Sequence, residues 1–159
     1  LGKEMRYTQM YVSSMRIRFP DINYQTDVDE SLLGQAVPKL IIQLLVENAI
    51  KFCTTRRPPW NISVLAERTE RGLVLRIEDN GPGFDLVTLE TLRGQIECIA
   101  ESGLLPKLEI NGMGILNVFL RIRLMFGEAA TLELENREMG GAVTRVILPP
   151  RDWTPEGGV

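Results

Sequence analysis

Polar side chains interrupt an otherwise apolar segment between residues 37 and 52 at intervals of three or four positions. That period predicts a helix in which these side chains share one narrow stripe. The stripe consists of Lys39, Gln43, Glu47, Asn48 and Lys51. A carboxylate, an amide and an ammonium group cost stability in a buried seam unless they have partners. The stripe therefore either faces water, with Glu47 and Lys51 as a surface pair one turn apart, or binds a polar ligand.

A carboxylate ends an apolar row in the segment LVLRIEDNGPGF. Alternation predicts a strand over residues 73–79, in which Asp79 shares a face with the apolar side chains. An ionised carboxylate beside a core needs hydrogen-bond donors, and the exocyclic amino group of a purine is one such donor. Gly81 and Gly83 would let the backbone approach a flat ligand closely. In the alternative interpretation, Asp79 only caps the turn at Asn80.

Two glycines precede a strongly apolar segment that ends at Gly127. Gly112 and Gly114 stand where a helix over residues 115–126 is predicted to begin. Backbone N–H groups and the positive end of the helix dipole at such a start form a phosphate site. The pair is a poor dinucleotide-binding fingerprint, because the third glycine position holds Asn117 and no apolar strand precedes it.

Histidine is absent from all 159 residues, which narrows the available chemistry. Without imidazole the chain has no Ser-His or Cys-His catalytic pair and no histidine-ligated metal. Two cysteines, Cys53 and Cys98, are too few for a structural zinc site. They form either a disulfide or, as favoured here, a pair of buried reduced thiols. A formal net charge of -3 argues against a nucleic-acid partner.

Helices and strands must position these residues, and the apolar pattern places both along the chain. Predicted helices cover residues 3–19, 37–52, 85–100 and 115–126, and predicted strands cover residues 22–28, 61–68, 73–79, 131–135 and 142–148. Pro38 fits the first turn of the second helix. Because strands follow one another through short turns, the pattern predicts an α+β fold. We expect a two-layer α/β sandwich with helices on one face of a mixed sheet.

The length suits one domain of ordinary size with its own core. We expect that domain over residues 20–150. Residues 1–20 are predicted to be an N-terminal helix with heptad spacing between Met5 and Phe19. This helix either packs on the domain's own sheet or continues from an upstream dimerising segment. Residues 151–159 contain proline and glycine and are expected to form a flexible tail.

The motifs together resemble one superfamily. A helix with the wording LVENAIK, then Asp79-x-Gly81-x-Gly83, then Gly112-x-Gly114 occur in the order found in the Bergerat-fold ATPases, which unite gyrase, the heat-shock chaperones and histidine kinases. The chain is most similar to sensor histidine kinases of the LytS/YesM type. Their N-box resembles LVENAIK, and their second glycine box resembles GMGILNVFLRIRLMFG. The likeness runs from about Met5 to Pro149.

The resemblance implies a catalytic and nucleotide-binding role for three residues of the predicted helix. Asn48 would bind the Mg²⁺ that bridges the nucleotide phosphates, as an oxygen ligand to a hard cation. Lys51 would reach the phosphates of ATP. Glu47 would act as a base or orient the phosphoryl acceptor.

The resemblance also assigns the rest of the nucleotide site. Asp79 would accept a hydrogen bond from the adenine amino group, in a pocket shaped by Gly81 and Gly83. Gly112 and Gly114 would hinge a lid and present N–H groups to the phosphates, with Asn117 also binding the nucleotide. The mobile ATP lid is expected within residues 85–111.

Three positions depart from the family pattern. Leu44 stands one helical turn before Asn48, where hydrolytic relatives carry a water-activating glutamate. We therefore expect phosphoryl transfer to a protein acceptor rather than vigorous ATP hydrolysis. Phe52 replaces a histidine of the related kinases, so that contact is lost. Ala142 replaces a common threonine, with a mild expected effect.

The resemblance predicts the ATP-binding catalytic domain of a two-component sensor histidine kinase. It would bind Mg-ATP and transfer the γ-phosphoryl group to a histidine outside this chain. Implied partners are an upstream dimerisation and phosphoacceptor domain, a response regulator and, in the full-length protein, a second copy in a homodimer. The expected location is the cytoplasmic part of a membrane-anchored bacterial sensor. Alternatives are a nucleotide-binding regulatory module without transfer activity and an anti-sigma-factor-like serine kinase.

Overall fold

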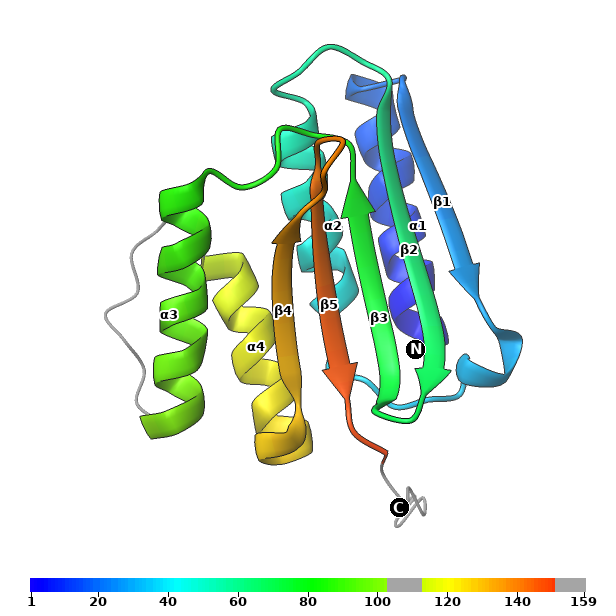
Figure 1. Ribbon diagram of the computed structural model, residues 1–159. Helices are drawn as coiled ribbons and strands as arrows, with labels where there is room; N and C mark the ends of the chain where they lie inside the picture. The colour runs from blue at the N-terminus through cyan, green and yellow to red at the C-terminus, as the bar shows by residue number, and fades with distance from the viewer. Residues whose placement is uncertain (103–112, 151–159) are drawn as a thin grey trace.

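In residues 1–102 and 113–150, which the computed structural model describes, five strands form one mixed sheet and four α-helices cover one of its faces (Figure 1). The strand order is β1-β2-β3-β5-β4, with β1 parallel to β2 and the other neighbours antiparallel. The strands are β1 Ile22–Val28, β2 Trp60–Thr69, β3 Gly72–Asp79, β4 Thr131–Asn136 and β5 Ala142–Leu148. The predicted α+β sandwich is confirmed.

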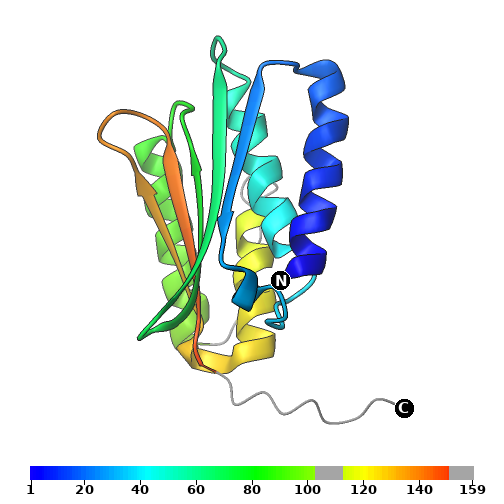
Figure 2. The same cartoon turned by 90° about the vertical axis from the view of Figure 1, so that its right-hand side faces the viewer.

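The helices form a second layer behind the sheet (Figure 2). They are α1 Gly2–Arg18, α2 Ile41–Cys53, α3 Leu86–Ser102 and α4 Met113–Phe126, with short 3₁₀ turns η1 Glu30–Leu32 and η2 Gly127–Ala129. Within this layer α1 contacts α2, α2 contacts α4, and α4 contacts α3. The α2 helix also packs on β2 and β3, so it lies over the middle of the sheet.

The start of α2 differs from the prediction. The helix begins at Ile41, and residues 37–40 precede it, so Pro38 does not lie in its first turn. Leu40, the N-cap residue, adopts a left-handed conformation with φ 64° and ψ 16°. A left-handed residue interrupts the helical path, which is why the helix cannot extend back to residue 37.

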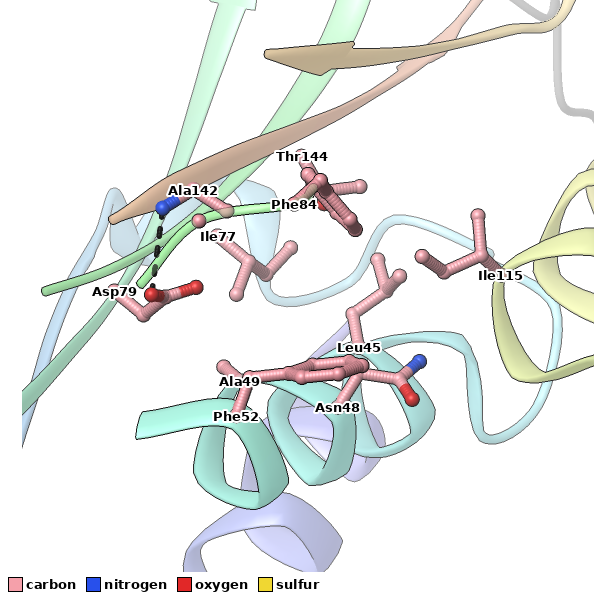
Figure 3. Close-up of a pocket in the computed structure, with 11 residues that line it drawn as sticks. Leu45, Asn48, Ala49, Phe52, Ile77, Asp79, Phe84, Ile115, Ala142 and Thr144 are labelled. Atoms are coloured by element: carbon pink, nitrogen blue, oxygen red, sulfur yellow. Dashed lines mark hydrogen bonds between the residues drawn. The ribbon is translucent and has the colours of Figure 1, made fainter. Parts of the chain in front are cut away.

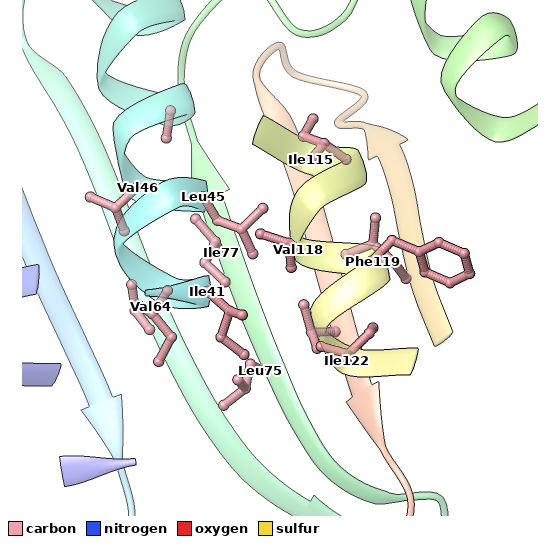
Figure 4. Packing of buried hydrophobic residues seen from close by; sticks show 14 of the residues in the cluster. Ile41, Leu45, Val46, Val64, Leu75, Ile77, Ile115, Val118, Phe119 and Ile122 are labelled. Carbon is pink, nitrogen blue, oxygen red and sulfur yellow. The ribbon is translucent and has the colours of Figure 1, made fainter. Parts of the chain in front are cut away.

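One continuous core joins the two layers. Figure 4 shows Leu45 of α2, Ile77 of β3 and Val118 of α4 pointing toward one another. All three are buried, as the apolar periodicity of their segments predicts. Each such aliphatic side chain contributes about 1.5–3 kcal/mol relative to remaining in water. This packing fixes α2 and α4 on the sheet.

The N-terminal helix α1 packs within the domain, with α2 as its main neighbour. Its buried face includes Thr8 and Val12, both 0% exposed. The first interpretation placed this helix on the domain's own sheet, whereas its main neighbour is the helix α2. Continuation into an upstream dimerising segment stays a prediction.

Both cysteines are free in the structure. Cys53 is buried at the end of α2, whereas Cys98 is exposed on α3. The disulfide alternative is therefore wrong, and the buried-thiol expectation holds for Cys53 alone. No helix in the described ranges combines the length and apolarity needed to cross a bilayer. The expected flexible tail, residues 151–159, lies outside the described residues.

Candidate functional site

A cleft of about 580 Å³ opens between the end of α2, the loop after β3 and the start of α4. Its lining includes residues of α2, of the β3–α3 loop and of α3, with Ile115 of α4. The cleft continues into a narrow inner pocket (Figure 3). The two share Asn48, Phe52, Gly83, Phe84 and Ile115. The pocket floor is formed by α2 and by the inner faces of β3 and β5. The core packing described above thus produces a cavity where the helix layer and the sheet separate.

Asp79, the last residue of β3, lies in the inner pocket. Its Oδ1 accepts hydrogen bonds from the backbone N–H groups of Gly81, at 2.8 Å, and Ala142, at 3.3 Å. Figure 3 shows the second carboxylate oxygen directed into the pocket. One oxygen therefore caps the turn, in agreement with the turn-capping interpretation, while the other faces the cavity; recognition of a purine amino group stays a prediction.

Burial raises the pKa of Asp79 above its ordinary value of 3.8. The hydrogen bonds from Gly81 and Ala142 and the nearby Arg137 act in the opposite direction but are outweighed. Desolvation of the charged form dominates when a carboxylate is enclosed by apolar groups. A ligand that donates a hydrogen bond to the free oxygen would compensate part of that desolvation.

The two glycines after Asp79 permit close contacts. A Cβ on Gly81 would lie 2.9 Å from Asp79 Oδ1 and 3.2 Å from the backbone of Cys53, so the loop runs directly against the end of α2. Gly83 has a φ of 78°, and a Cβ there would lie 2.7 Å from Asn136 Oδ1. A residue with a Cβ would clash at either position, so the two glycines allow the loop to lie this close to its neighbours.

Asn48 and Gly114 meet at the other end of the pocket. A Cβ on Gly114, near the start of α4, would lie 2.9 Å from Asn48 Nδ2. That nitrogen is buried and has no hydrogen-bond partner among the described residues. The close approach of Gly114 therefore restricts where the Asn48 amide can lie. Asn48 lines both the inner pocket and the cleft.

Lys51 and Phe52 form the outer side of the cleft on α2. Lys51 is exposed, and its Nζ lies 5.8 Å from the centre of the Phe52 ring. The Phe52 ring is 39% exposed and lies across the pocket in Figure 3. An exposed ammonium and an exposed aromatic face at the mouth of a cleft suit a ligand with an anionic part and a flat part.

Glu47 lies on a different side of α2. It accepts a hydrogen bond from Gln43 at 3.0 Å and forms no ion pair with Lys51, so the predicted surface pair is wrong. Burial, and secondarily the charge of Glu47, raise the pKa of Tyr11 on α1. Glu47 therefore faces α1 rather than the cleft, whose described lining does not include it.

The remaining predicted residues are distributed unevenly. Lys39 precedes α2, and its carbonyl oxygen accepts a hydrogen bond from Arg121 at 2.8 Å. Asn117 is exposed on α4 and is not part of the described cleft lining. Gly112 lies outside the described residues, as do residues 103–111 of the expected lid. The part of that lid that the structure describes is mainly α3.

Two residues of the site have no motif in the sequence. Asn136, at the end of β4, accepts from the Phe84 N–H at 2.7 Å and donates to the Phe84 carbonyl oxygen at 2.8 Å. This pair of hydrogen bonds fixes Phe84 at the pocket. Thr144 of β5 lines the pocket and is 7% exposed. In the alternating row 142, 144, 146 and 148, Thr144 is the one polar residue, and this is the signal that the sequence offers for it.

Whether Mg²⁺ fits the cleft depends on which side chains could coordinate it. No group of three or more His, Cys, Asp or Glu side chains that could hold a metal occurs in residues 1–102 and 113–150. The Asn48 amide supplies one hard oxygen beside an open cleft, and Mg²⁺ is commonly held by few protein ligands together with substrate phosphates and water. The residues present therefore fit Mg²⁺ that arrives with a nucleotide.

Comparison with known proteins connects this geometry to a family. Residues 35–152 match the family described as histidine kinase-, DNA gyrase B-, and HSP90-like ATPase. The chain is similar to the sensor protein LytS of Staphylococcus saprophyticus, with 34% identity over 92% of this chain and 24% of that protein. It is 31% identical to the sensor histidine kinase/phosphatase LytS of Staphylococcus aureus, over 88% of this chain and 23% of that one. It thus spans about a quarter of the curated relatives it matches.

Solved structures support the same fold. The catalytic domain of histidine kinase ThkA superposes with a TM-score of 0.62 and 18% identity, covering 94% of this chain and 91% of that chain. The mycobacterial sensor histidine kinase MprB gives 0.59 and 18%, covering 91% and 93%. At this identity the likeness concerns the fold, which is the same helix layer on a mixed sheet.

Proposed function

The chain belongs to the family of histidine kinase-, DNA gyrase B-, and HSP90-like ATPases, and from this premise we propose that it is the ATP-binding catalytic domain of a sensor histidine kinase. In this proposal it binds Mg-ATP and transfers the γ-phosphoryl group to a histidine outside the chain. The observation that carries the proposal is the inner pocket, where the free oxygen of Asp79 faces an otherwise largely apolar cavity.

The inner pocket suits a 6-aminopurine. The Asp79 carboxylate is an acceptor held in place by two backbone N–H groups, so it is oriented before a ligand arrives. Apolar side chains of Leu45, Ala49 and Ile77 enclose the space beside it. A flat base with one amino group would bury its ring against these side chains and donate to Asp79. A 6-oxo base would place an acceptor against an acceptor there.

The outer cleft suits the phosphates. Lys51 supplies an ammonium group at the mouth, and the start of α4 at Gly114 supplies the positive end of a helix. Asn48 lies between the two, and its amide oxygen would hold Mg²⁺. The metal, when bound, neutralises charge on the β- and γ-phosphates during transfer.

Catalysis in this proposal rests on positioning and on charge neutralisation. Lys51 and Asn48 orient the terminal phosphate toward an acceptor that enters from outside. Glu47 faces α1, so we propose that it orients the acceptor from that side of α2 rather than touching the base or the phosphates. Leu44, half-buried one turn before Asn48, cannot activate water, which favours transfer over hydrolysis.

The partners and location follow from the same proposal. Because the chain contains no histidine, the acceptor belongs to a segment or chain outside it. We propose an upstream dimerisation and phosphoacceptor domain, a homodimeric full-length kinase and a response regulator as the next acceptor. The domain would act as the cytoplasmic part of a membrane-anchored bacterial sensor.

Phosphoryl transfer tests the proposal. The chain is incubated with γ-labelled Mg-ATP and a separate fragment that carries the upstream helical segment and its histidine. We expect acid-labile label on the fragment, and loss of that label with Asn48→Asp, which adds negative charge beside the phosphates. Parent chain that binds Mg-ATP without labelling the fragment would instead support a regulatory nucleotide-binding module. Label on a serine would support a serine kinase.

A further inference from the structure

The N-cap of α2 is a strained position. Leu40 is the single non-glycine residue with positive φ in the described part of the chain, at φ 64°. Leu40 is 40% exposed, and its side chain makes no capping hydrogen bond to the helix. Leucine does not adopt this conformation by preference, so contacts from elsewhere must hold it.

Side chains from both neighbouring helices hold this segment. Glu4 of α1 accepts a hydrogen bond through Oε1 from the Leu40 N–H group at 2.7 Å. Arg121 of α4 donates to the carbonyl oxygen of Lys39 at 2.8 Å. Both α1 and α4 contact α2. The two hydrogen bonds therefore fix the start of α2 relative to both neighbours.

The Glu4 carboxylate that accepts this hydrogen bond is buried. Glu4 is 4% exposed, and its Oε2 is buried without a partner among the described residues. An anion at the N-terminal end of a helix is favoured by the helix dipole and by free N–H groups.

We propose that Glu4 is a positioning residue, which fixes where α2 begins and thereby places Asn48 in the cleft. Asn48 lies about two helical turns after Leu40 on the same helix. Its packing tolerates little displacement, because a Cβ on Gly114 would already lie 2.9 Å from its Nδ2. A shift or fraying of the first turn of α2 would therefore reach the site. The consequence for nucleotide binding rests on the function proposed above.

Two substitutions of Glu4 separate the hydrogen bond from the charge. Glu4→Gln keeps an acceptor oxygen of similar size, whereas Glu4→Leu removes it. We expect Glu4→Leu to weaken Mg-ADP binding by about tenfold, the effect of one hydrogen bond to a charged group, and Glu4→Gln to recover most of it. Titration calorimetry on the full chain measures the affinity, and NMR amide exchange measures protection of the Leu40 N–H. That protection is expected to fall in Glu4→Leu and to return in Glu4→Gln.

A matched control lies one turn along the same helix. Thr8 is fully buried and its hydroxyl has no partner among the described residues, so Thr8→Val alters the same buried face without removing a hydrogen bond to the start of α2. It is expected to leave Mg-ADP affinity and Leu40 protection unchanged. Unchanged affinity in folded Glu4→Leu would overturn the proposal, and so would an equal loss in Thr8→Val.

A glycine substitution keeps the proposal testable should Glu4→Leu not fold. Leu40→Gly adopts the left-handed conformation without side-chain strain. Glu4→Asp, whose shorter side chain weakens the hydrogen bond to the Leu40 N–H, should therefore cost less affinity in that background than in the parent. An equal cost in both backgrounds would contradict the proposal. Failure of the parent to bind Mg-ADP would refute the proposed function instead. In that case the Leu40 exchange data still decide whether Glu4 holds the helix start.

Discussion

At the scale of single residues, the site depends on groups that are held by backbone or by shape. In Asp79 one carboxylate oxygen, Oδ1, accepts both backbone hydrogen bonds, which leaves the other oxygen to face the cavity. Asn48 lies against Gly114, and its side-chain nitrogen has no hydrogen-bond partner within the described part of the chain. Such groups are oriented by the fold itself, and a ligand therefore need not rearrange them.

The raised pKa of Asp79 predicts how Asp79→Asn changes stability with pH. A raised folded-state pKa contributes stability that is fully present below the ordinary value of 3.8 and is lost as pH rises through the raised value. The variant does not titrate, and its oxygen can still accept from Gly81 and Ala142. Its unfolding free energy relative to the parent should therefore increase with pH and then level off. Urea unfolding at a series of pH values measures this difference, and a difference that decreases with pH would contradict it.

Gly114 and Gly94 offer a matched pair of glycine substitutions. Gly114→Ala places a Cβ 2.9 Å from Asn48 Nδ2, so we expect the displaced amide to cost Mg-ADP affinity about tenfold or more. Gly94, inside α3, has nothing within 4 Å of its added Cβ. Gly94→Ala should keep the affinity and raise the unfolding free energy by about 0.5–1 kcal/mol. Equal affinities in the two variants, measured by calorimetry, would contradict this account of Asn48.

At the scale of elements, local pattern predicts the bodies of helices better than their ends. The apolar period of residues 41–53 is strong enough to identify α2 and its polar stripe. Its start depends on Glu4 and Arg121, which lie far away in the sequence, and no local signal at Pro38 or Leu40 reveals them. Hydrogen bonds from distant residues therefore set the start of α2 at Ile41, rather than Pro38 in a first turn.

The α3 helix is tied to the edge strand β4 by one side chain. Arg93 donates from Nε and Nη2 to the carbonyl oxygen of Leu134 at 3.2 and 2.6 Å. Arg93→Ala is expected to lower the unfolding free energy by about 1–2 kcal/mol, because a charge-assisted hydrogen bond to the strand is lost. The exposed Glu90 on the same helix is the control, and Glu90→Ala should change the unfolding free energy by less than about 0.5 kcal/mol. Equal effects in urea unfolding would show that Arg93 does not anchor the helix.

At the scale of the whole molecule, the fold gathers residues from distant segments into one cleft. Sequence motifs pointed to Asn48, Asp79 and Gly83, which line the pocket, because such residues are unusual in apolar segments. They did not identify Asn136 or Thr144, whose contribution depends on strand pairing across the sheet. They also grouped Glu47 with Asn48, although neighbouring positions on a helix face about 100° apart.

The chain alone should neither label itself on histidine nor hydrolyse ATP readily. It contains no histidine, and Leu44 supplies no water-activating carboxylate near the phosphates. The chain is incubated with γ-labelled Mg-ATP. Stability of any label to acid and to base then measures labelling on histidine, and the rate of phosphate release measures ATP hydrolysis. We expect no acid-labile label on the chain and slow release. Fast release of phosphate would contradict the role assigned to Leu44.

The central claim is that Asp79 accepts a hydrogen bond from the amino group of an adenine nucleotide. A calorimetric titration with Mg-ADP tests it most directly. The parent chain should bind one equivalent. Asp79→Asn directs an amide donor at the amino group and should weaken binding by about tenfold to a hundredfold while the domain stays folded. Equal affinity in the folded variant, or no binding by the parent, would contradict the claim.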